Sequence, residues 1–212
     1  MKVDSIVYNI ADNCSQRILT LKGTMRRRLF HIFACLSIVM AAWFLPQMIL
    51  ILTMGSVTFL FLAFEFTRLR VTGINRWFVS HFGSMLREEE VSSVTTSSYV
   101  LVAAVVSYLV FGRDIAMLSV SFLAIGDVAA AIVGQSIGRT KLFGKALEGD
   151  LACFISCLAI GFVLHYAGLS VSSLTIIVGS LGATVGQAIK MPVDDNLTLP
   201  LFASVVMVAI PG

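Results

Sequence analysis

The stretch "QMILILTMGSVTFLFLAF", residues 47–64, contains no charged side chain. A helix rises about 1.5 Å per residue, so about 20 apolar residues cross the roughly 30 Å hydrocarbon core of a bilayer. The stretch therefore predicts a membrane-spanning helix. The rest of the chain agrees: 58% of its 212 residues are hydrophobic and only 13% are charged, whereas about a quarter are charged in soluble proteins.

Further apolar runs of similar length predict about seven spans. The fourth and sixth are rich in Gly, Ala and Ser, which favours close helix packing. We expect an all-α fold, a polytopic transmembrane helix bundle, with residues 1–24 as an N-terminal cytoplasmic arm and residues 25–212 as a single membrane-embedded catalytic domain. The predicted spans are 29–45, 47–64, 95–111, 114–134, 150–167, 171–189 and 197–211.

The basic residues predict the orientation of the bundle, because cytoplasmic loops hold the excess of Lys and Arg. With the N-terminus in the cytoplasm, the seven spans place every Lys and Arg on that side except Arg113. We therefore expect an integral multi-pass membrane protein whose charged loops, 65–94, 135–149 and 190–196, face the cytoplasm.

The first of these loops shows two patterns. Apolar residues recur at helical spacing from Ile74 to Leu86, which predicts an amphipathic helix on the membrane surface. Before it, Glu65 and Arg68 are three apart and can pair on one helix face. After it, residues 87–90 resemble a solvated run of charges.

Asp127 is an ionisable residue inside a predicted span, where a charge costs several kcal/mol on insertion scales. It indicates either a functional site or a carboxylate paired with a neighbouring helix. Gly134 and Gly138 form a small-xxx-small pair, for which helix packing is the first interpretation. Cys153 and Cys157 share a helix face, and we expect them to pack rather than to bind metal.

Two loops carry groups suited to phosphate and metal. "GRTKLFGKALEG", residues 138–149, combines glycines with cations and resembles a phosphate-holding loop, although it lacks the Walker A spacing. An ordinary cytoplasmic loop remains the alternative. In "KMPVDDNLTLPL", residues 190–201, Asp194 and Asp195 offer the hard oxygen ligands that Mg²⁺ prefers. The alternative is a turn in which Asn196 caps the last helix.

Several segments, in this order, resemble the polyprenol kinase family of membrane enzymes, which includes dolichol, phytol and farnesol kinases and the CTP-dependent diacylglycerol kinase. The resemblance covers about residues 26 to 202, and the Gly-Asp and Asp-Asp-Asn segments are its most specific parts. The segments are "RRLFH" (27–31), "FEFTR" (64–68), "LREEEVSSVTTSSY" (86–99), "IGDVAAAIVGQSIGRTK" (125–141), "GKALEGD" (144–150) and "PVDDNLTLPL" (192–201).

The resemblance implies transfer of the terminal phosphate of a nucleotide, generally CTP, to the hydroxyl of a membrane lipid alcohol such as a polyprenol, phytol or diacylglycerol, with the active site on the cytoplasmic face. It implies Asp127, Asp195 and Lys145 as catalytic residues. It implies Mg²⁺ ligands at Asp127, Asp194 and Asp195, with Asn196 beside them. The nucleotide and phosphate groups are implied at Gly126, Gly138, Arg139, Lys141, Gly144, Lys145, Glu148, Arg28 and His31, with Glu148 holding one of the cations.

The chain departs from the family pattern at three positions. Ala146 and Asp150 stand where the family usually has serine, and Gln187 stands where glutamate is frequent. Two alternatives to the kinase remain: a phosphatidate cytidylyltransferase-like enzyme that makes CDP-lipid, and a small cation-coupled transporter. We expect a lipid, a nucleoside triphosphate and the bilayer as partners and no nucleic acid; the oligomeric state is open.

Overall fold

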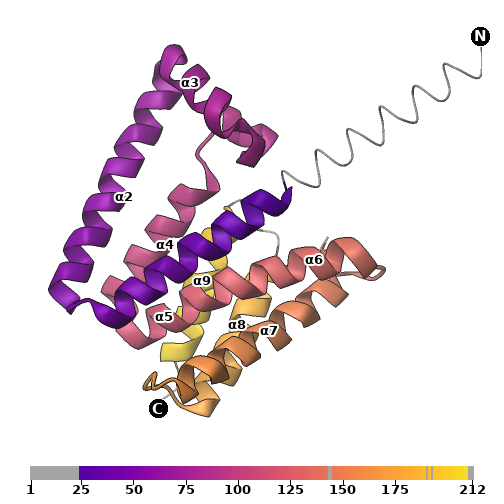
Figure 1. Ribbon diagram of the computed structural model, residues 1–212. Helices are drawn as coiled ribbons and strands as arrows, with labels where there is room; N and C mark the ends of the chain where they lie inside the picture. The colour runs from indigo at the N-terminus through magenta and orange to yellow at the C-terminus, as the bar shows by residue number, and fades with distance from the viewer. Residues whose placement is uncertain (1–23, 143–144, 190, 192, 210–212) are drawn as a thin grey trace, which may run out of the picture.

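The computed structural model describes residues 24–142, 145–189, 191 and 193–209. They form a bundle of helices with one short hairpin (Figure 1). The long elements are helix Thr24–Phe44, α2 (Gln47–Arg70), α4 (Thr96–Phe111), α5 (Arg113–Phe122), α6 (Val128–Ile137), α7 (Leu147–Tyr166), α8 (Ser173–Ala188) and α9 (Asp195–Val208). The shorter ones are α3 (Thr72–Phe82), η1 (Gly83–Met85), η2 (Glu88–Val91), β1 (Lys141–Leu142) and β2 (Lys145–Ala146).

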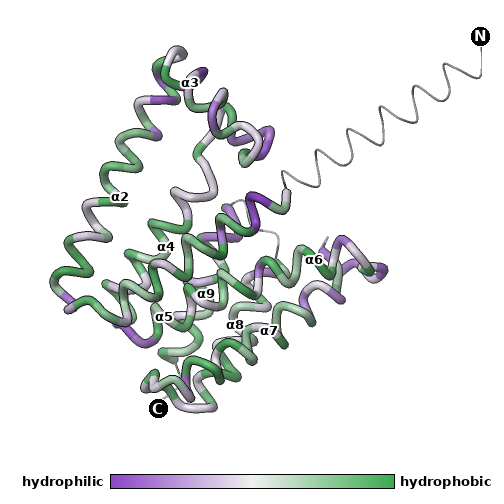
Figure 2. Tube along the Cα trace, viewed as in Figure 1, coloured by the Kyte–Doolittle hydropathy of each residue, from purple (hydrophilic) through white to green (hydrophobic). Residues whose placement is uncertain are grey.

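Each predicted apolar run falls on a helix, which confirms an all-α bundle of the membrane type. Four helices are long and apolar enough to cross a bilayer: Thr24–Phe44, Gln47–Arg70, Arg113–Ile137 and Leu147–Tyr166. The apolar helices α4, α8 and α9 have only 14 to 16 residues, slightly below the usual spanning length of about 17. Hydrophobic residues run along the helices, and hydrophilic stretches gather near their ends (Figure 2).

Close approach of α6 and α7 depends on small residues. A Cβ added at Gly149 would lie 2.7 Å from the carbonyl oxygen of Ala130 and 3.3 Å from the Cα of Gly134. One added at Gly138 would lie 2.6 Å from the Cβ of Ala146. The packing interpretation of the Gly134–Gly138 pair is therefore confirmed, with α7 and the hairpin as the partners.

The predicted fourth span is interrupted by a π-helical turn, η3 (Leu123–Asp127), between α5 and α6. Within it, a Cβ at Gly126 would lie 2.6 Å from the Sγ of Cys157 and 3.0 Å from that of Cys153. Both thiols are buried and free. The two cysteines thus pack against the wide turn, as expected, and Asp127 lies where the turn ends.

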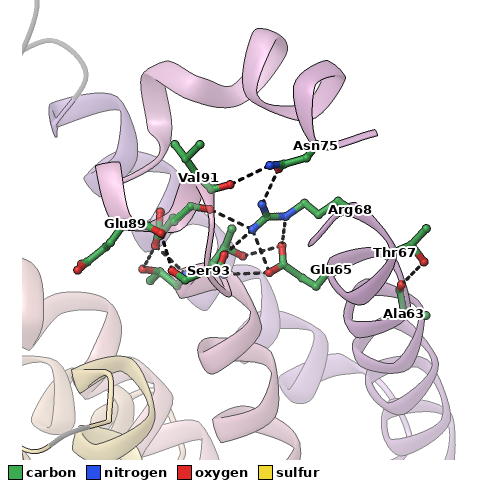
Figure 3. A network of polar contacts seen from close by, with 11 residues as sticks. Ala63, Glu65, Thr67, Arg68, Asn75, Glu89, Val91 and Ser93 are labelled. Atoms are coloured by element: carbon green, nitrogen blue, oxygen red, sulfur yellow. Dashed lines mark hydrogen bonds and ion pairs between the residues drawn. The ribbon is translucent and has the colours of Figure 1, made fainter. Parts of the chain in front are cut away.

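A buried polar network fixes the end of α2 (Figure 3). Arg68 has no exposed surface and forms the predicted ion pair with Glu65, with 2.8 Å between Nε and Oε1. It also donates to the carbonyl oxygens of Glu90 and Ser93, at 3.2 and 2.8 Å, and to the side chain of Asn75, at 3.0 Å. The predicted amphipathic helix, α3, is present, and Asn75 ties it to this network.

The prediction of a solvated charge run at residues 87–90 is wrong for Glu90, which is buried. Its carboxylate accepts the backbone N–H groups of Arg87 and Thr96, both at 2.8 Å. Glu90 thereby satisfies amides that a short helix and the start of α4 leave free. The run is a structural joint between η2 and α4.

Candidate active site at the polar end of the bundle

Contacts between distant parts of the chain gather the predicted site at one end of the bundle. Arg28 donates to the Oε1 of Gln135 at 2.6 Å. Farther along, Arg87 meets Asp194, with 3.2 Å between Nη1 and Oδ2. Helix Thr24–Phe44, α6, η2 and the start of α9 therefore share this end, which we call the polar end.

The predicted phosphate-holding loop forms an antiparallel hairpin in which Lys141 is opposite Ala146. A two-residue strand is the exception to the all-α prediction. Glu148 accepts the backbone N–H groups of Arg139 and Thr140, both at 3.1 Å. Glu148 thus orders the backbone just before the hairpin, whereas we expected it to hold a cation; the side chains of Arg139 and Lys141 are exposed. Gly144 lies outside the described residues.

Lys145 joins the hairpin to two helix ends. Its Nζ lies 2.8 Å from the Oδ2 of Asp195, at the first residue of α9. It also donates to the backbone carbonyl of Gln187 near the end of α8. The lysine is about one-quarter exposed and the aspartate one-third, so both remain open to a ligand.

Asp194, and not Asn196, caps α9. Its Oδ1 accepts the N–H of Asn196 at 2.9 Å, while its Oδ2 faces Arg87. The alternative of a side-chain cap on the last helix was correct, but the capping residue lies two positions before Asn196, because the helix begins at Asp195. Asn196 is buried, and its Oδ1 has no hydrogen-bond partner among the described residues.

Asp127 lies close to charged groups that come from several elements. His31, Asp195, Arg87 and Lys145 all lie within electrostatic range of it, and all but Arg87 are predicted site residues. The ring of His31 lies against the backbone carbonyl of Leu123 in the π turn. Asp127 therefore belongs to a cluster of mixed charge rather than to a single ion pair.

The donor atoms at this end suit a magnesium ion that is shared with phosphates. Within the described ranges, no group of three or more His, Cys, Asp or Glu is arranged to hold a metal. Mg²⁺, however, usually takes only one or two carboxylates, together with water and substrate phosphates. Asp127, Asp195 and the unpartnered Oδ1 of Asn196 are such hard donors. The residues fit the ion, and Mg²⁺ remains a prediction.

A cavity of about 300 Å³ adjoins Lys145. Most of its wall consists of glycine and alanine. We call it the Asp150 cavity; its lining is Ala130, Ala131, Gly134, Gln135, Gly138, Lys141, Lys145, Ala146, Gly149, Asp150 and Gln187.

The sequence analysis did not assign Arg87, Gln135, Asp150 or Gln187 to the site. Asp150 and Gln187 were noted only as departures from the family pattern. Arg87 lies in a segment that resembles the family, residues 86–99, but its position beside three glutamates suggested solvation instead. These residues are brought to the site by contacts that no local pattern encodes.

Comparisons with known proteins place the chain among distant relatives of lipid kinases. No protein-family model matches the chain, and no solved structure does. It is 26% identical to an uncharacterised protein of Rickettsia prowazekii, over 83% of this chain and 89% of that one. It is 24% identical to CTP-dependent diacylglycerol kinase 1 of Saccharomyces cerevisiae, over 69% and 59%. It is 34% identical to a probable chloroplastic phytol kinase of Triticum aestivum, over 49% and 40%. The chain thus spans less than two thirds of the length of these kinases.

Proposed function

We propose that the protein is a membrane-embedded lipid kinase that transfers the terminal phosphate of CTP to the hydroxyl of a polyprenol- or phytol-like alcohol or of diacylglycerol. The observation that carries the proposal is the meeting of Lys145 with Asp195, close to Asp127, beside a cavity at the polar end of the bundle. The distant similarity to a diacylglycerol kinase and a phytol kinase supports it.

Phosphoryl transfer depends chiefly on positioning and on stabilising charge, because the protein has little covalent chemistry to perform. Lys145 and Arg87 provide positive charge for the phosphates. Asp195 pairs with Lys145, and Asp194 pairs with Arg87. When a more highly charged anion binds, each cation transfers some of its hydrogen bonds from the carboxylate to the anion. Exposed Arg139 and Lys141 extend the positive charge toward the outside of the site.

In the transfer step, the lipid oxygen bonds to the terminal phosphorus and the bond to the bridging oxygen of CDP breaks. Asp127 or Asp195 orients the acceptor hydroxyl and accepts its proton. Asp127, Asp195 and the side-chain oxygen of Asn196 would hold Mg²⁺, which would supply neutralising charge on the phosphates. A lipid alcohol keeps its hydroxyl at the membrane interface, which matches a site at helix ends.

The proposed orientation places the polar end at the cytoplasmic face of a multi-pass protein. The predicted topology puts every Lys and Arg except Arg113 on that side. In the structure Arg113 lies at the opposite end, where it donates to the carbonyl oxygen of Leu45 after helix Thr24–Phe44. This placement supports a site facing the nucleotide pool.

The test is an incubation of the purified full chain with γ-labelled CTP, Mg²⁺ and, separately, phytol, dolichol and diacylglycerol. We expect label in one of the lipids. Label released as pyrophosphate in a parallel incubation with phosphatidate, with CDP-lipid formed, overturns the kinase in favour of the cytidylyltransferase alternative. Absence of transfer to every alcohol, from CTP and from ATP, also contradicts the proposal.

The matched variants are Asp195→Asn and Glu88→Gln. Each removes one negative charge, but Glu88 is exposed in η2, and among the described residues it forms no hydrogen bond or ion pair with Lys145 or Asp195. Loss of transfer in the first and retention in the second ties the activity to the site.

A further inference from the structure

The polar side chains in the wall of the Asp150 cavity are of two kinds. Lys141 and Lys145 contribute cations, and Lys141 is exposed. The other polar side chains in the wall include Asp150 and Gln187, which are only 5% and 7% exposed. The wall therefore combines cations with a buried carboxylate and a buried amide.

Two buried side chains have hydrogen-bonding capacity that the described residues do not use. The Oδ2 of Asp150 and the Oε1 of Gln187 are both buried and without a hydrogen-bond partner there. Leaving a buried polar atom unpaired is unfavourable. Both atoms are acceptors. They are therefore complementary to a ligand that offers two N–H or O–H hydrogens.

The position of the cavity relative to the acidic cluster decides which ligand group it receives. None of Asp127, Asp194 and Asp195 lines the cavity, but Lys145 both lines it and binds Asp195. In a nucleoside triphosphate the terminal phosphate and the base lie at opposite ends of the molecule. With the phosphates at Lys145 and the reacting phosphorus beside Asp195 and Asp127, the base extends toward the cavity.

We infer that the Asp150 cavity binds the base of the donor nucleotide, and that Asp150 and Gln187 select a base that carries an exocyclic amino group, as cytosine does. The inference rests on the proposed function and adds to it the part of the protein that recognises the base. The two hydrogens of the amino group are donated to the Oδ2 of Asp150 and to the Oε1 of Gln187. The glycine and alanine walls leave room for a flat ring.

Other occupants fit less well. A phosphate beside the buried Asp150 carboxylate would meet like charge with little solvent screening. The acceptor hydroxyl of the lipid must lie at the reacting phosphorus, and the cavity does not include the acids assigned to that position. The hydroxyls of the ribose are the remaining hydrogen-bond donors of the nucleotide. The experiment distinguishes binding of the ribose from binding of the base.

The test compares kcat/KM for CTP, UTP and 2′-deoxy-CTP in the wild type and in Asp150→Asn. Uracil presents a carbonyl where cytosine presents the amino group, and the asparagine amide can donate to that carbonyl. One base-edge contact discriminates by about 1–3 kcal/mol, or roughly 5- to 150-fold. We expect the CTP/UTP ratio to fall about 10-fold or more in Asp150→Asn. The ratio does not depend on how much of the variant folds.

Two further variants sharpen the result. Asp150→Asn combined with Gln187→Glu moves the carboxylate across the cavity and is expected to restore preference for CTP in part. Glu88→Gln, with the same loss of charge at an exposed position of η2, is expected to leave the ratio unchanged. An unchanged CTP/UTP ratio in Asp150→Asn overturns the inference. So does a change confined to the ratio of CTP to its deoxy form, because that assigns Asp150 to the ribose.

A measurement of nucleotide binding distinguishes failure of this inference from failure of the proposed function. The rise in melting temperature that CDP and UDP cause in the purified wild type and in Asp150→Asn measures selection of the base without turnover. Loss of CDP preference in the variant supports the inference even if no lipid is phosphorylated. Equal stabilisation of the wild type by CDP and UDP overturns it.

Discussion

Replacing Arg68 by methionine is expected to destabilise the protein strongly. The change leaves the Glu65 carboxylate, 2% exposed, without its cation. It also removes the donors to the carbonyl oxygens of Glu90 and Ser93. Breaking a buried ion pair by removing one partner costs about 3–5 kcal/mol. For a chain of this size, 1 kcal/mol corresponds to about 2–4 °C in Tm, so the expected loss is about 6–20 °C.

The assay is thermal unfolding of the detergent-purified protein, followed by tryptophan fluorescence. Trp77 lies in α3, the helix that Asn75 ties to the network, and therefore reports on this region. Arg70→Met is the control: it removes the same charge from the same helix, but Arg70 is exposed and lies over the Phe66 ring. Exposed substitutions of this kind usually change stability by less than about 0.5 kcal/mol.

A double-mutant cycle with Glu65→Leu separates the ion pair from the remaining hydrogen bonds. Removing both charges is expected to cost less than the sum of the single changes, with a coupling of about 1–3 kcal/mol. If Arg68→Met melts within about 3 °C of the wild type, or if the two changes are additive, Arg68 is not buried against Glu65 and the joint between α2, α3 and α4 is wrongly described.

Three further predictions concern the site and the packing. Lys145→Gln is expected to lower kcat/KM for the nucleotide about 100-fold in steady-state assays, because a charge that stabilises the transferring phosphate is lost. Asp127→Asn and Asp195→Asn should each abolish measurable transfer; unchanged phosphorylation of every tested alcohol by both variants contradicts the assigned site. Gly149→Ala is expected to lower stability by about 1–3 kcal/mol, read from Tm, because its Cβ would lie 2.7 Å from a carbonyl oxygen of α6. Gly55→Ala, with no atom within 4 Å, should leave Tm within about 2 °C; equal losses in both variants contradict the packing of α6 against α7.

The helices were predictable from the sequence because apolar length is a strong local signal in a membrane protein. The Glu65–Arg68 pair was predictable for a similar reason, since residues three apart on a helix are neighbours. The hairpin at 141–146 was not, because a two-residue strand has no periodicity. The number of spans and their orientation remain predictions.

Long-range contacts explain what the sequence did not predict at the site. Arg87 and Asp194 are separated by 107 positions, and no spacing rule relates them. Glu90 is a different case, because the two backbone amides that it accepts lie only three residues before and six residues after it; they reach its carboxylate because the chain turns at η2. Asp127 could be identified because a charge inside a membrane span is unfavourable, and Asp194 and Asp195 because they are adjacent in the sequence. Their partners could only be found from the fold.

The π turn at 123–127 bears on how relatives of this chain can differ in length. In a regular α-helix, one added or deleted residue rotates everything beyond it by about 100°. A π turn accommodates one extra residue inside a helix, and such turns are frequent at functional sites. Loss of one residue here leaves α5 and α6 with the faces they already present to their neighbours. A one-residue gap in a sequence alignment therefore belongs inside this span, next to Asp127, and not in the loops that flank it.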